Sequence, residues 1–583
     1  MVAARLHVLA GFLALVALVP ACKKKVEPPP PVKNEPTVET PVPAPDGLAA
    51  EAIIRAPDAI VQSFRTITPL IPDRAAPLLS DMLHVNRETT EQVDGAKPAY
   101  FVMVRRGDDQ GFVFAVQLKD SGKVLDQLGK QGLARTEDAT QALSIFEAGQ
   151  AALGPRGQVL GVRRNFLLAA SSVAALKELA PYATRTLPTR SVPVQDVMVT
   201  VPQAAMRGPL RDGLNRVLQA AALQRKLLVA KAKGSDAGAP KSVGALDAIG
   251  EYSARTNERI VSWLADAGEA HVAISTKDGA LSIRADVEIP DPASPFGKQV
   301  AGWPVGNAVT ALAAPAGALL AFTGRSGEAS RVESSRDFAE ALATMYPDDV
   351  TPKERQKIDE FLAAWDKART ESTTGALLYE GPARIALAAR LGAKDPAALA
   401  KLTKEAFTSI FAIKGVAHGL TKEGIGVPKF SEATIAGTKV DVLSLNLPHK
   451  PGEKPKAGEP ETADIVFGVV PGKNELAIVA GVGSKELFAT FVETKPEKTL
   501  ESFPSLKQQL EKLGPDLAGL AMGLPSRIMP LASGANVTTV APPVDPVMLA
   551  IGKGAKGPFV ALDVSRPAVE LAGRFAMSTM MKP

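Results

Sequence analysis

The sequence feature that most restricts the fold is a strict alternation of apolar and polar residues near the middle of the chain. From Leu281 to Ile289 every second residue is apolar, and the residues between them are polar or charged. A second strand-like stretch, His271–Thr276, precedes it across the turn sequence Lys277-Asp278-Gly279. A period of two places the apolar side chains on one face of a strand, and Asp-Gly is a strong hairpin signal. The pattern predicts an antiparallel sheet with one face buried and one face in water.

Hairpins and helices alternate along much of the chain. Strands are predicted at Tyr100–Val104 and Phe112–Leu118 around a glycine-containing loop. A helix is predicted over Thr351–Arg369, because Thr351 is a good N-cap and Glu354 completes a capping box. Its apolar residues then fall on one face, at Ile358, Phe361, Leu362 and Trp365. Residues 49–85 are interpreted instead as short helices broken by prolines. This mixture predicts an α+β fold in which mainly antiparallel sheets pack with helices.

A long helical hairpin is predicted over residues 207–267. In its first helix, Leu210, Leu214, Val217 and Leu218 form part of one apolar stripe, and basic residues occupy the other faces. A polar turn and a second apolar helix follow, as in an αα-hairpin. A basic amphipathic helix can lie on a membrane surface. Packing on its own domain is the commoner arrangement, and we expect it here.

The order of elements repeats between the two ends of the chain, which predicts two related halves. A strand–turn–strand–helix series over Gln158–Leu179 matches one over Asp464–Val492, and a strand beginning at Asp196 matches one beginning at Asp516. The hairpin predicted over Ala376–Leu391 also resembles the central hairpin, since an Asp-Pro pair follows both. An old duplication leaves such a pattern, but common α+β architecture can produce the same order.

The first residues have the layout of an export signal. Arg5 precedes an apolar run, Leu9–Val19, that is too short for a transmembrane helix of roughly 20 residues. Ala21 and Cys22 follow, and Cys22 is the one cysteine among 583 residues. This segment resembles a bacterial lipoprotein signal peptide with its lipobox, which implies cleavage before Cys22 and attachment of lipid to it. In the alternative interpretation, the segment is an uncleaved anchor and the cysteine is coincidental.

A proline-rich segment follows the cysteine. Residues 23–47 contain eight prolines, which favour an extended polyproline II conformation over helix or sheet. We interpret residues 22–48 as the lipidated cysteine and a tether, with a recognition ligand as the alternative. By analogy with lipoproteins, Lys23 after the cysteine favours sorting to the outer membrane.

The predicted organisation has these boundaries: a signal peptide over 1–21, the tether over 22–48, a first half over 49–330, connecting helices over 331–371 and a second half over 372–583.

Composition argues against several kinds of partner. The 67 basic and 62 acidic residues nearly balance, and no dense basic patch interleaved with aromatic residues indicates nucleic-acid binding. Beyond the signal, no apolar stretch is long enough to span a membrane. If Cys22 is lipidated, no thiol remains for a disulfide, a metal or nucleophilic chemistry. We therefore expect no nucleic acid, no metal and no cofactor.

No catalytic motif stands out. His84, His271, His418 and His449 are widely separated, and the chain has no HExxH, GxSxG or Walker sequence. Residues 552–557 fit GxGxxG, but a strand pattern follows them where a dinucleotide site needs a helix, so we expect a hairpin loop. The sequence assigns no catalytic residue.

The sequence thus predicts a lipid-anchored protein of a bacterial cell envelope, facing the periplasm or the cell surface, that binds an envelope partner or is structural. Its layout resembles uncharacterised bacterial envelope proteins with repeated strand-pair and helix units, a resemblance that implies no activity. One alternative is a carrier or chaperone for lipids or other apolar ligands, with a cavity on the order of several hundred Å³. Another is a hydrolase whose site assembles only in three dimensions.

Overall fold

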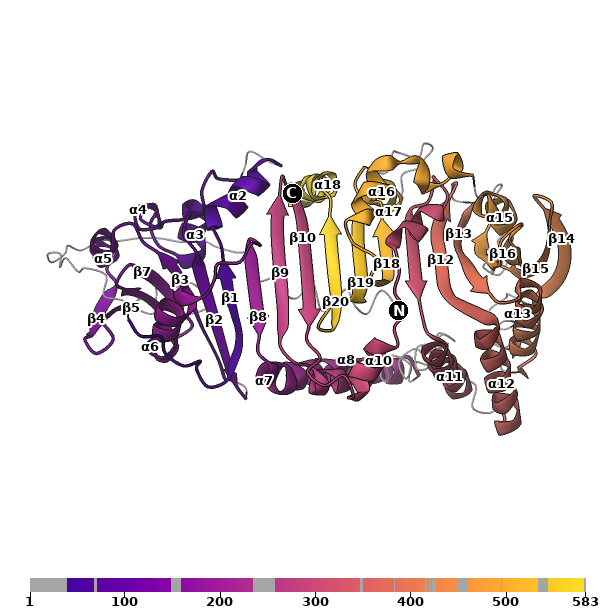
Figure 1. Cartoon of the computed structure of the whole chain (residues 1–583), viewed down its shortest axis with the longest axis horizontal. Helices are drawn as coiled ribbons and strands as arrows, with labels where there is room; N and C mark the ends of the chain where they lie inside the picture. The colour runs from indigo at the N-terminus through magenta and orange to yellow at the C-terminus, as the bar shows by residue number, and fades with distance from the viewer. Residues whose placement is uncertain are drawn as a thin grey trace. The chain divides into compact units, whose positions relative to one another are not determined.

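The computed structural model describes residues 39–67, 71–107, 109–147, 159–233, 257–345, 350–381, 383–414, 417–418, 421, 426–447, 460–493, 495–532 and 544–580. The chain divides into two compact units. The first comprises Met1–Leu210 and Glu269–Ile283, and the second comprises Arg211–Gly268 and Arg284–Pro583 (Figure 1). Each unit is described by itself below.

The first unit contains antiparallel strands in the order β4-β5-β6-β7-β3-β2-β1-β8-β9. The strands are β1 (Leu48–Ile54), β2 (Ala99–Arg106), β3 (Asp109–Gln117), β4 (Ala134–Asp138), β5 (Leu143–Glu147), β6 (Val159–Arg163), β7 (Phe166–Ala170), β8 (Val197–Val201) and β9 (Ala270–Lys277). The helices are α2 (Pro57–Arg65), α3 (Ala75–Leu83), α4 (Arg87–Thr90), α5 (Ser121–Lys130), α6 (Val173–Pro181) and α7 (Gln203–Ala205), with shorter turns η2 (Tyr182–Thr186), η3 (Leu187–Thr189) and η4 (Met206–Leu210).

Helices cover both faces of this sheet near its centre. In β7, Leu167 and Ala169 belong to a buried cluster that includes residues of α3 and α5. Leu168 and Ala170 belong to a second cluster that includes residues of α6. Successive residues of a strand point to opposite faces, so β7 is buried on both sides and its sequence is continuously apolar.

The second unit contains antiparallel strands in the order β14-β15-β16-β17-β13-β12-β11-β18-β19-β20. The strands are β11 (Leu320–Arg325), β12 (Arg369–Tyr379), β13 (Ile385–Ala393), β14 (Lys429–Ile435), β15 (Thr438–Asn446), β16 (Thr462–Val469), β17 (Glu475–Val482), β18 (Leu517–Gly523), β19 (Val547–Lys553) and β20 (Pro558–Val564). The helices are α8 (Arg211–Lys233), α10 (Pro295–Ala301), α11 (Glu328–Met345), α12 (Pro352–Ala368), α13 (Pro396–Phe411), α15 (Ser484–Val492), α16 (Pro504–Glu511), α17 (Pro525–Ala532) and α18 (Arg566–Met580), with shorter turns η5 (Ala308–Ala313), η6 (Pro496–Lys498) and η7 (Leu500–Ser502). The boundary between the units falls inside β10 (Ala280–Val287).

The two units share one strand order. Each strand of the first order has a counterpart whose label is higher by ten: β1 lies between β2 and β8, and β11 lies between β12 and β18. A helix also follows β3 and β13 in the same way. Asp120 caps α5 by accepting a hydrogen bond from the Lys123 amide, and Asp395 caps α13 by accepting from the Ala397 and Ala398 amides. The predicted α+β fold is confirmed.

The sequence matches coincide with this topology in two places and differ in one. The Gln158–Leu179 and Asp464–Val492 series are β6-β7-α6 and β16-β17-α15, and the strands after Asp196 and Asp516 are β8 and β18. The hairpin over Ala376–Leu391 is β12–β13, the counterpart of β2–β3 and not of β9–β10. Asp395 and Pro396 begin helix α13, whereas Asp291 and Pro292 lie in a turn before α10, which begins at Pro295. The shared Asp-Pro pair therefore does not identify counterparts. Duplication itself stays a prediction.

The prediction of helix from residue 49 is wrong at its start, because Leu48–Ile54 is strand β1. Ala, Leu and Glu favour helix in isolation. Here β1 pairs with β2 on one side and β8 on the other, and these contacts override the intrinsic preference.

The expected boundaries between the halves also differ from the structure. Strand β11 pairs with β12 and β18, so it belongs to the second sheet although 49–330 was assigned to the first half. Helices α11 and α12 lie between β11 and β12 in the chain, so residues 331–371 are mostly an insertion within the second sheet. Helix α8 and the helical residues 257–266 form parts of the second unit, and the turn of the predicted hairpin, 234–256, lies outside the described residues.

Two local predictions are confirmed, one at a hairpin turn and one at the start of a helix. Asp278 and Gly279 between β9 and β10 have φ of 52° and 81°, as the type I′ turn of an Asp-Gly hairpin requires. The capping box of α12 forms with both of its reciprocal hydrogen bonds, between Thr351 and Glu354. No helix among the described residues is long and apolar enough to cross a membrane.

Candidate binding cleft between two helices

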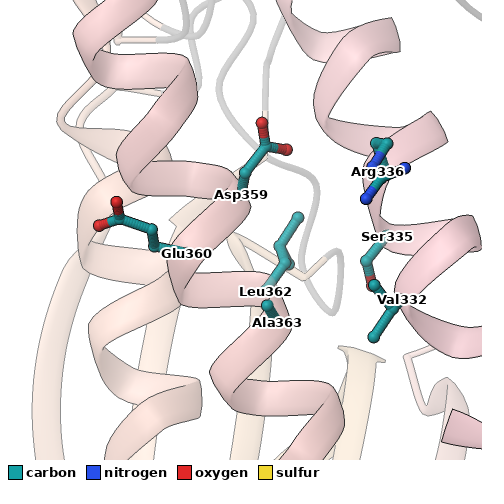
Figure 2. A pocket seen from close by; sticks show the side chains of 7 residues that line it. All are labelled: Val332, Ser335, Arg336, Asp359, Glu360, Leu362 and Ala363. Carbon is teal, nitrogen blue, oxygen red and sulfur yellow. The ribbon is translucent and has the colours of Figure 1, made fainter. Parts of the chain in front are cut away.

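Helices α11 and α12 enclose a cleft of about 270 Å³ in the second unit. Figure 2 shows its lining on the facing sides of the two helices, with Arg336 opposite Asp359 and with Glu360 turned outward. The lining residues are Val332, Ser335 and Arg336 from α11, and Asp359, Glu360, Leu362 and Ala363 from α12. Spacings of three or four residues along each helix place these residues on one side of it, so one face of each helix lines the cleft.

A small apolar core holds the two helices together. Ala339 of α11 and Ile358 of α12 are buried against Val350 and Ile413, and Leu362 packs at the edge of this cluster. The apolar spacing of Ile358 and Leu362, one turn apart, is what predicted this helix face from the sequence. The cleft is therefore the part of the helix seam that these side chains leave unfilled.

The floor of the cleft leads to a buried carboxylate. The Ser335 hydroxyl donates to Asp366 Oδ2 at 2.5 Å, and the Asp366 side chain is only 1% exposed. Arg369 Nη1 lies 3.7 Å from Asp366 Oδ1. Arg331 donates instead to backbone carbonyls, at 3.0 Å to Asp366 and 3.3 Å to Arg369. These contacts join the start of α11 to the end of α12.

Burial changes the acidity of this group of charges. Desolvation raises the pKa of Asp366, although the Ser335 hydrogen bond and the two arginines oppose that shift. Desolvation also lowers the pKa of Arg369 to about 10, against the attraction of Asp366. The Arg369 guanidinium lies 4.4 Å from the centre of the Trp365 ring, and Trp365 Nε1 donates to Thr403 at 3.0 Å. The network joins α11, α12 and α13.

The contacts of Ser335 do not suit a nucleophile. Ser335 has a carboxylate as its acceptor where a nucleophilic serine needs an accessible base, and that carboxylate is sealed from solvent. Asp359 has one side-chain oxygen, Oδ1, that is buried and without a hydrogen-bond partner. Beside Val332 and Leu362, Asp359 places a carboxylate next to apolar surface. The cleft can hold a small apolar group that carries a hydrogen-bond donor.

The residues singled out from the sequence do not converge. Cys22 and His449 lie outside the described residues. His84 ends α3, and His418 is exposed. His271 on β9 lies 3.0 Å from Glu269 Oε1 and 3.4 Å from the Thr200 hydroxyl on β8. The last contact is a cross-strand pair, and the His271 side chain is 33% exposed.

The remaining sequence motifs have structural roles. Residues 552 and 553 end β19, and residues 554–557 form the turn to β20, where the Gly554 amide donates to the Gly557 carbonyl at 2.7 Å. The predicted hairpin loop is confirmed. Among the described residues, no group of three or more His, Cys, Asp or Glu side chains is placed to hold a metal ion.

A second cluster of charges, missed by the sequence analysis, fixes the end of the proline-rich segment to the first unit. Glu39 accepts from Arg163 at 2.8 Å and from Arg164 at 2.9 Å, and Arg185 lies 3.6 Å away. The Val42 amide and carbonyl both bond to the Thr186 hydroxyl, at 2.9 Å and 2.8 Å. Ordered contacts therefore begin before Leu48, inside the segment interpreted as tether.

Comparisons with known proteins leave the function open. No family model and no curated protein matches the chain. Among solved structures, crystal form I of a protein named TP0453 aligns with a TM-score of 0.21 and 7% identity, covering 43% of this chain and 79% of that one. Crystal form III aligns with a TM-score of 0.20 and 10% identity, covering 43% and 78%. Likenesses at this level carry no argument about fold or function.

Proposed function

We propose that the protein is a lipid-anchored component of a bacterial cell envelope that acts by binding a partner and not by catalysis. The observation that carries this proposal is the attachment of Glu39 to the first unit by Arg163, Arg164 and Arg185. These contacts fix the position at which the proline-rich segment leaves the first unit. Between that point and Cys22, an extended polyproline chain reaches at most about 50 Å.

This geometry suits a protein that must work close to its membrane. A tether of that reach confines the first unit to a layer next to the bilayer, which raises the local concentration of the protein for partners in the same membrane. A lone acyl chain holds a protein only marginally, whereas the several chains of a lipoprotein cysteine hold it stably.

The binding part of the proposal rests on the α11–α12 cleft. Its volume of 270 Å³ lies just below the ~300–1,000 Å³ that drug-sized ligands occupy. It suits a single side chain of a partner better than a whole lipid. The Asp359 carboxylate and the exposed Arg336, which both line the cleft, add polar groups that would orient such a side chain.

Metabolic labelling with radioactive palmitate tests the anchor. The full chain, expressed in a bacterium that processes lipoproteins, should incorporate label and fractionate with membranes. A Cys22→Ser variant should do neither. Equal labelling of the two chains, or no labelling of either, contradicts the anchoring proposal.

Native mass spectrometry tests binding against transport. Residues 39–583 keep the Glu39 contacts and omit the acyl anchor. After export and gentle purification, the spectrum of this chain should show the mass of the protein without a bound lipid. A reproducible, stoichiometric lipid adduct would instead support the carrier alternative and overturn the present proposal.

A further inference from the structure

Helix α8 exposes three large apolar side chains to solvent. Val217, Leu223 and Leu227 have 65%, 60% and 63% of their surface exposed. At 100° per residue these three positions fall within a sector of about 120°. Leu214 and Leu218, on the opposite side of the helix, are only half-buried. Of the three exposed residues, only Val217 belongs to the apolar stripe expected from the sequence. Leu223 and Leu227 lie outside that stripe.

Exposure of this kind is unusual for a helix that only packs on its own domain. Isolated apolar residues are common on protein surfaces, but an aligned set on one helix marks an interaction site. Leu223 and Leu227 are one turn apart and cover adjoining surface. The exposed side of α8 is therefore available for a partner.

The charge of α8 indicates what that partner is. The helix carries one acidic residue, Asp212, and the basic residues Arg211, Arg216, Arg225, Lys226, Lys231 and Lys233. Long basic side chains can extend from an apolar face to reach phosphate groups, while their stems stay on the apolar surface. Arg216 and Gln224 are exposed in the same sector as the three apolar residues, so this side combines apolar side chains with positive charge. Such a combination fits the interface of an anionic bilayer.

We propose that α8 binds the surface of a membrane rich in anionic phospholipid, inserting Val217, Leu223 and Leu227 among the headgroups. This contact goes beyond the lipid anchor at Cys22 and does not depend on it. The tether would hold the first unit near the bilayer, and α8 would attach the second unit to it. A protein with both would stay on the membrane when either one alone releases.

The test uses the full mature chain, residues 22–583, with Cys22→Ser. This chain has neither lipid nor any other cysteine, so a failure of the lipidation proposal cannot affect the outcome. An environment-sensitive fluorophore is attached at Leu227→Cys, and the matched control carries it at Asn215→Cys, an exposed polar position on the same helix. Vesicles of phosphatidylcholine, with and without phosphatidylglycerol, are then added.

We expect the probe at position 227 to brighten and shift to the blue with phosphatidylglycerol vesicles, more weakly in high salt, while the probe at 215 changes little. A Leu223→Glu substitution should weaken this binding about tenfold or more, since it replaces inserted apolar surface with a charge of the wrong sign. An unchanged probe at 227, an equal response at 215, or unchanged binding by Leu223→Glu overturns the proposal. So does an emission at 227 already shifted without vesicles, which would mean that another segment or a second copy covers this side.

Discussion

Removing the carboxylate of Glu39 should release the proline-rich segment and destabilise the first unit. In Glu39→Ala the buried guanidinium of Arg163, 3% exposed, loses its carboxylate and keeps only the Gln141 carbonyl at 3.0 Å and the Thr184 hydroxyl at 2.8 Å. Breaking a buried ion pair by removing one partner costs ~3–5 kcal/mol. Glu39 itself is 22% exposed, and water screens the pair in part. We therefore expect a loss of about 2 kcal/mol in the free energy of unfolding.

The measurement must report on the first unit alone, since two units need not unfold together. Hydrogen exchange followed by mass spectrometry does this when it is read from peptides of β6 and β7. Arg163 ends β6, and Arg164 lies in the turn between these two strands. Their protection factors should fall about thirtyfold for 2 kcal/mol if these amides exchange by global opening of the unit. Peptides over residues 39–47 should lose protection altogether. Peptides of β16 and β17 in the second unit should not change.

Glu178→Ala is the matched control. Glu178 pairs with Arg106, and their side chains are 37% and 48% exposed, so the loss of this pair should leave protection of β6 and β7 unchanged. Glu39→Gln should fall between wild type and Glu39→Ala, because the amide oxygen still accepts a hydrogen bond without the charge. If Glu39→Ala and Glu178→Ala behave alike, the three arginines do not fix the segment, and the argument for a defined point of departure fails.

Three further predictions concern the second unit. Because burial raises the pKa of Asp366, the native state holds its proton at a pH where the unfolded chain has lost it. The stability that this group contributes is complete below the unfolded pKa near 4 and is lost as pH rises through the higher folded pKa. Urea titrations between pH 4 and 7 should therefore show a smaller loss of stability for Asp366→Asn than for wild type. Parallel curves of unfolding free energy against pH would contradict this. Thr351→Ala removes the N-cap of α12 and should cost about 1 kcal/mol in the same titration, whereas Thr351→Ser should cost almost nothing. Arg527, 1% exposed, donates to the carbonyls of Ala316 at 2.9 Å and Ala318 at 2.7 Å. Arg527→Met removes this donor from both carbonyls and should lower the free energy of unfolding by about 2–4 kcal/mol. Hydrogen exchange should then lose protection in η5 and β11 but not in the first unit.

Features encoded by neighbouring residues could be predicted from the sequence. The turn at Asp278 and Gly279 and the capping box at Thr351 and Glu354 depend on a few consecutive side chains and on backbone preference alone. The apolar spacing of Ile358 and Leu362 likewise showed which face of α12 is covered. The cleft between α11 and α12 could not be foreseen in the same way. The contact of Ser335 with Asp366 depends on how two helices are rotated against each other, which no local pattern specifies.

Charge clusters between distant segments left no signal in the sequence. Glu39 lies in a proline-rich stretch, and the arginines that bind it follow more than 100 residues later at the β6–β7 turn and in η2. A glutamate in such a stretch looks like any solvated charge. The positions that could have drawn attention are Arg163 and Arg164, because two consecutive arginines at the turn of an otherwise buried hairpin call for an acidic partner.

Two of the strands that escaped prediction, β1 and β11, are counterparts in the shared order, and both lie in the interior of their sheets. Each has a partner strand on both sides, so its conformation is decided by neighbours that are distant in sequence. The Ala- and Glu-containing sequence of β1 shows the consequence. Glu51 would suit the face of a helix, yet it is buried in the strand, where the Tyr182 hydroxyl donates to it at 2.8 Å and Arg190 pairs with it. A residue stabilised by such distant partners says little about its own secondary structure. In this chain, the order in which hairpins and helices recur is therefore a better guide to central strands than local propensity. A central strand assigned in one unit indicates the position of its counterpart in the other unit.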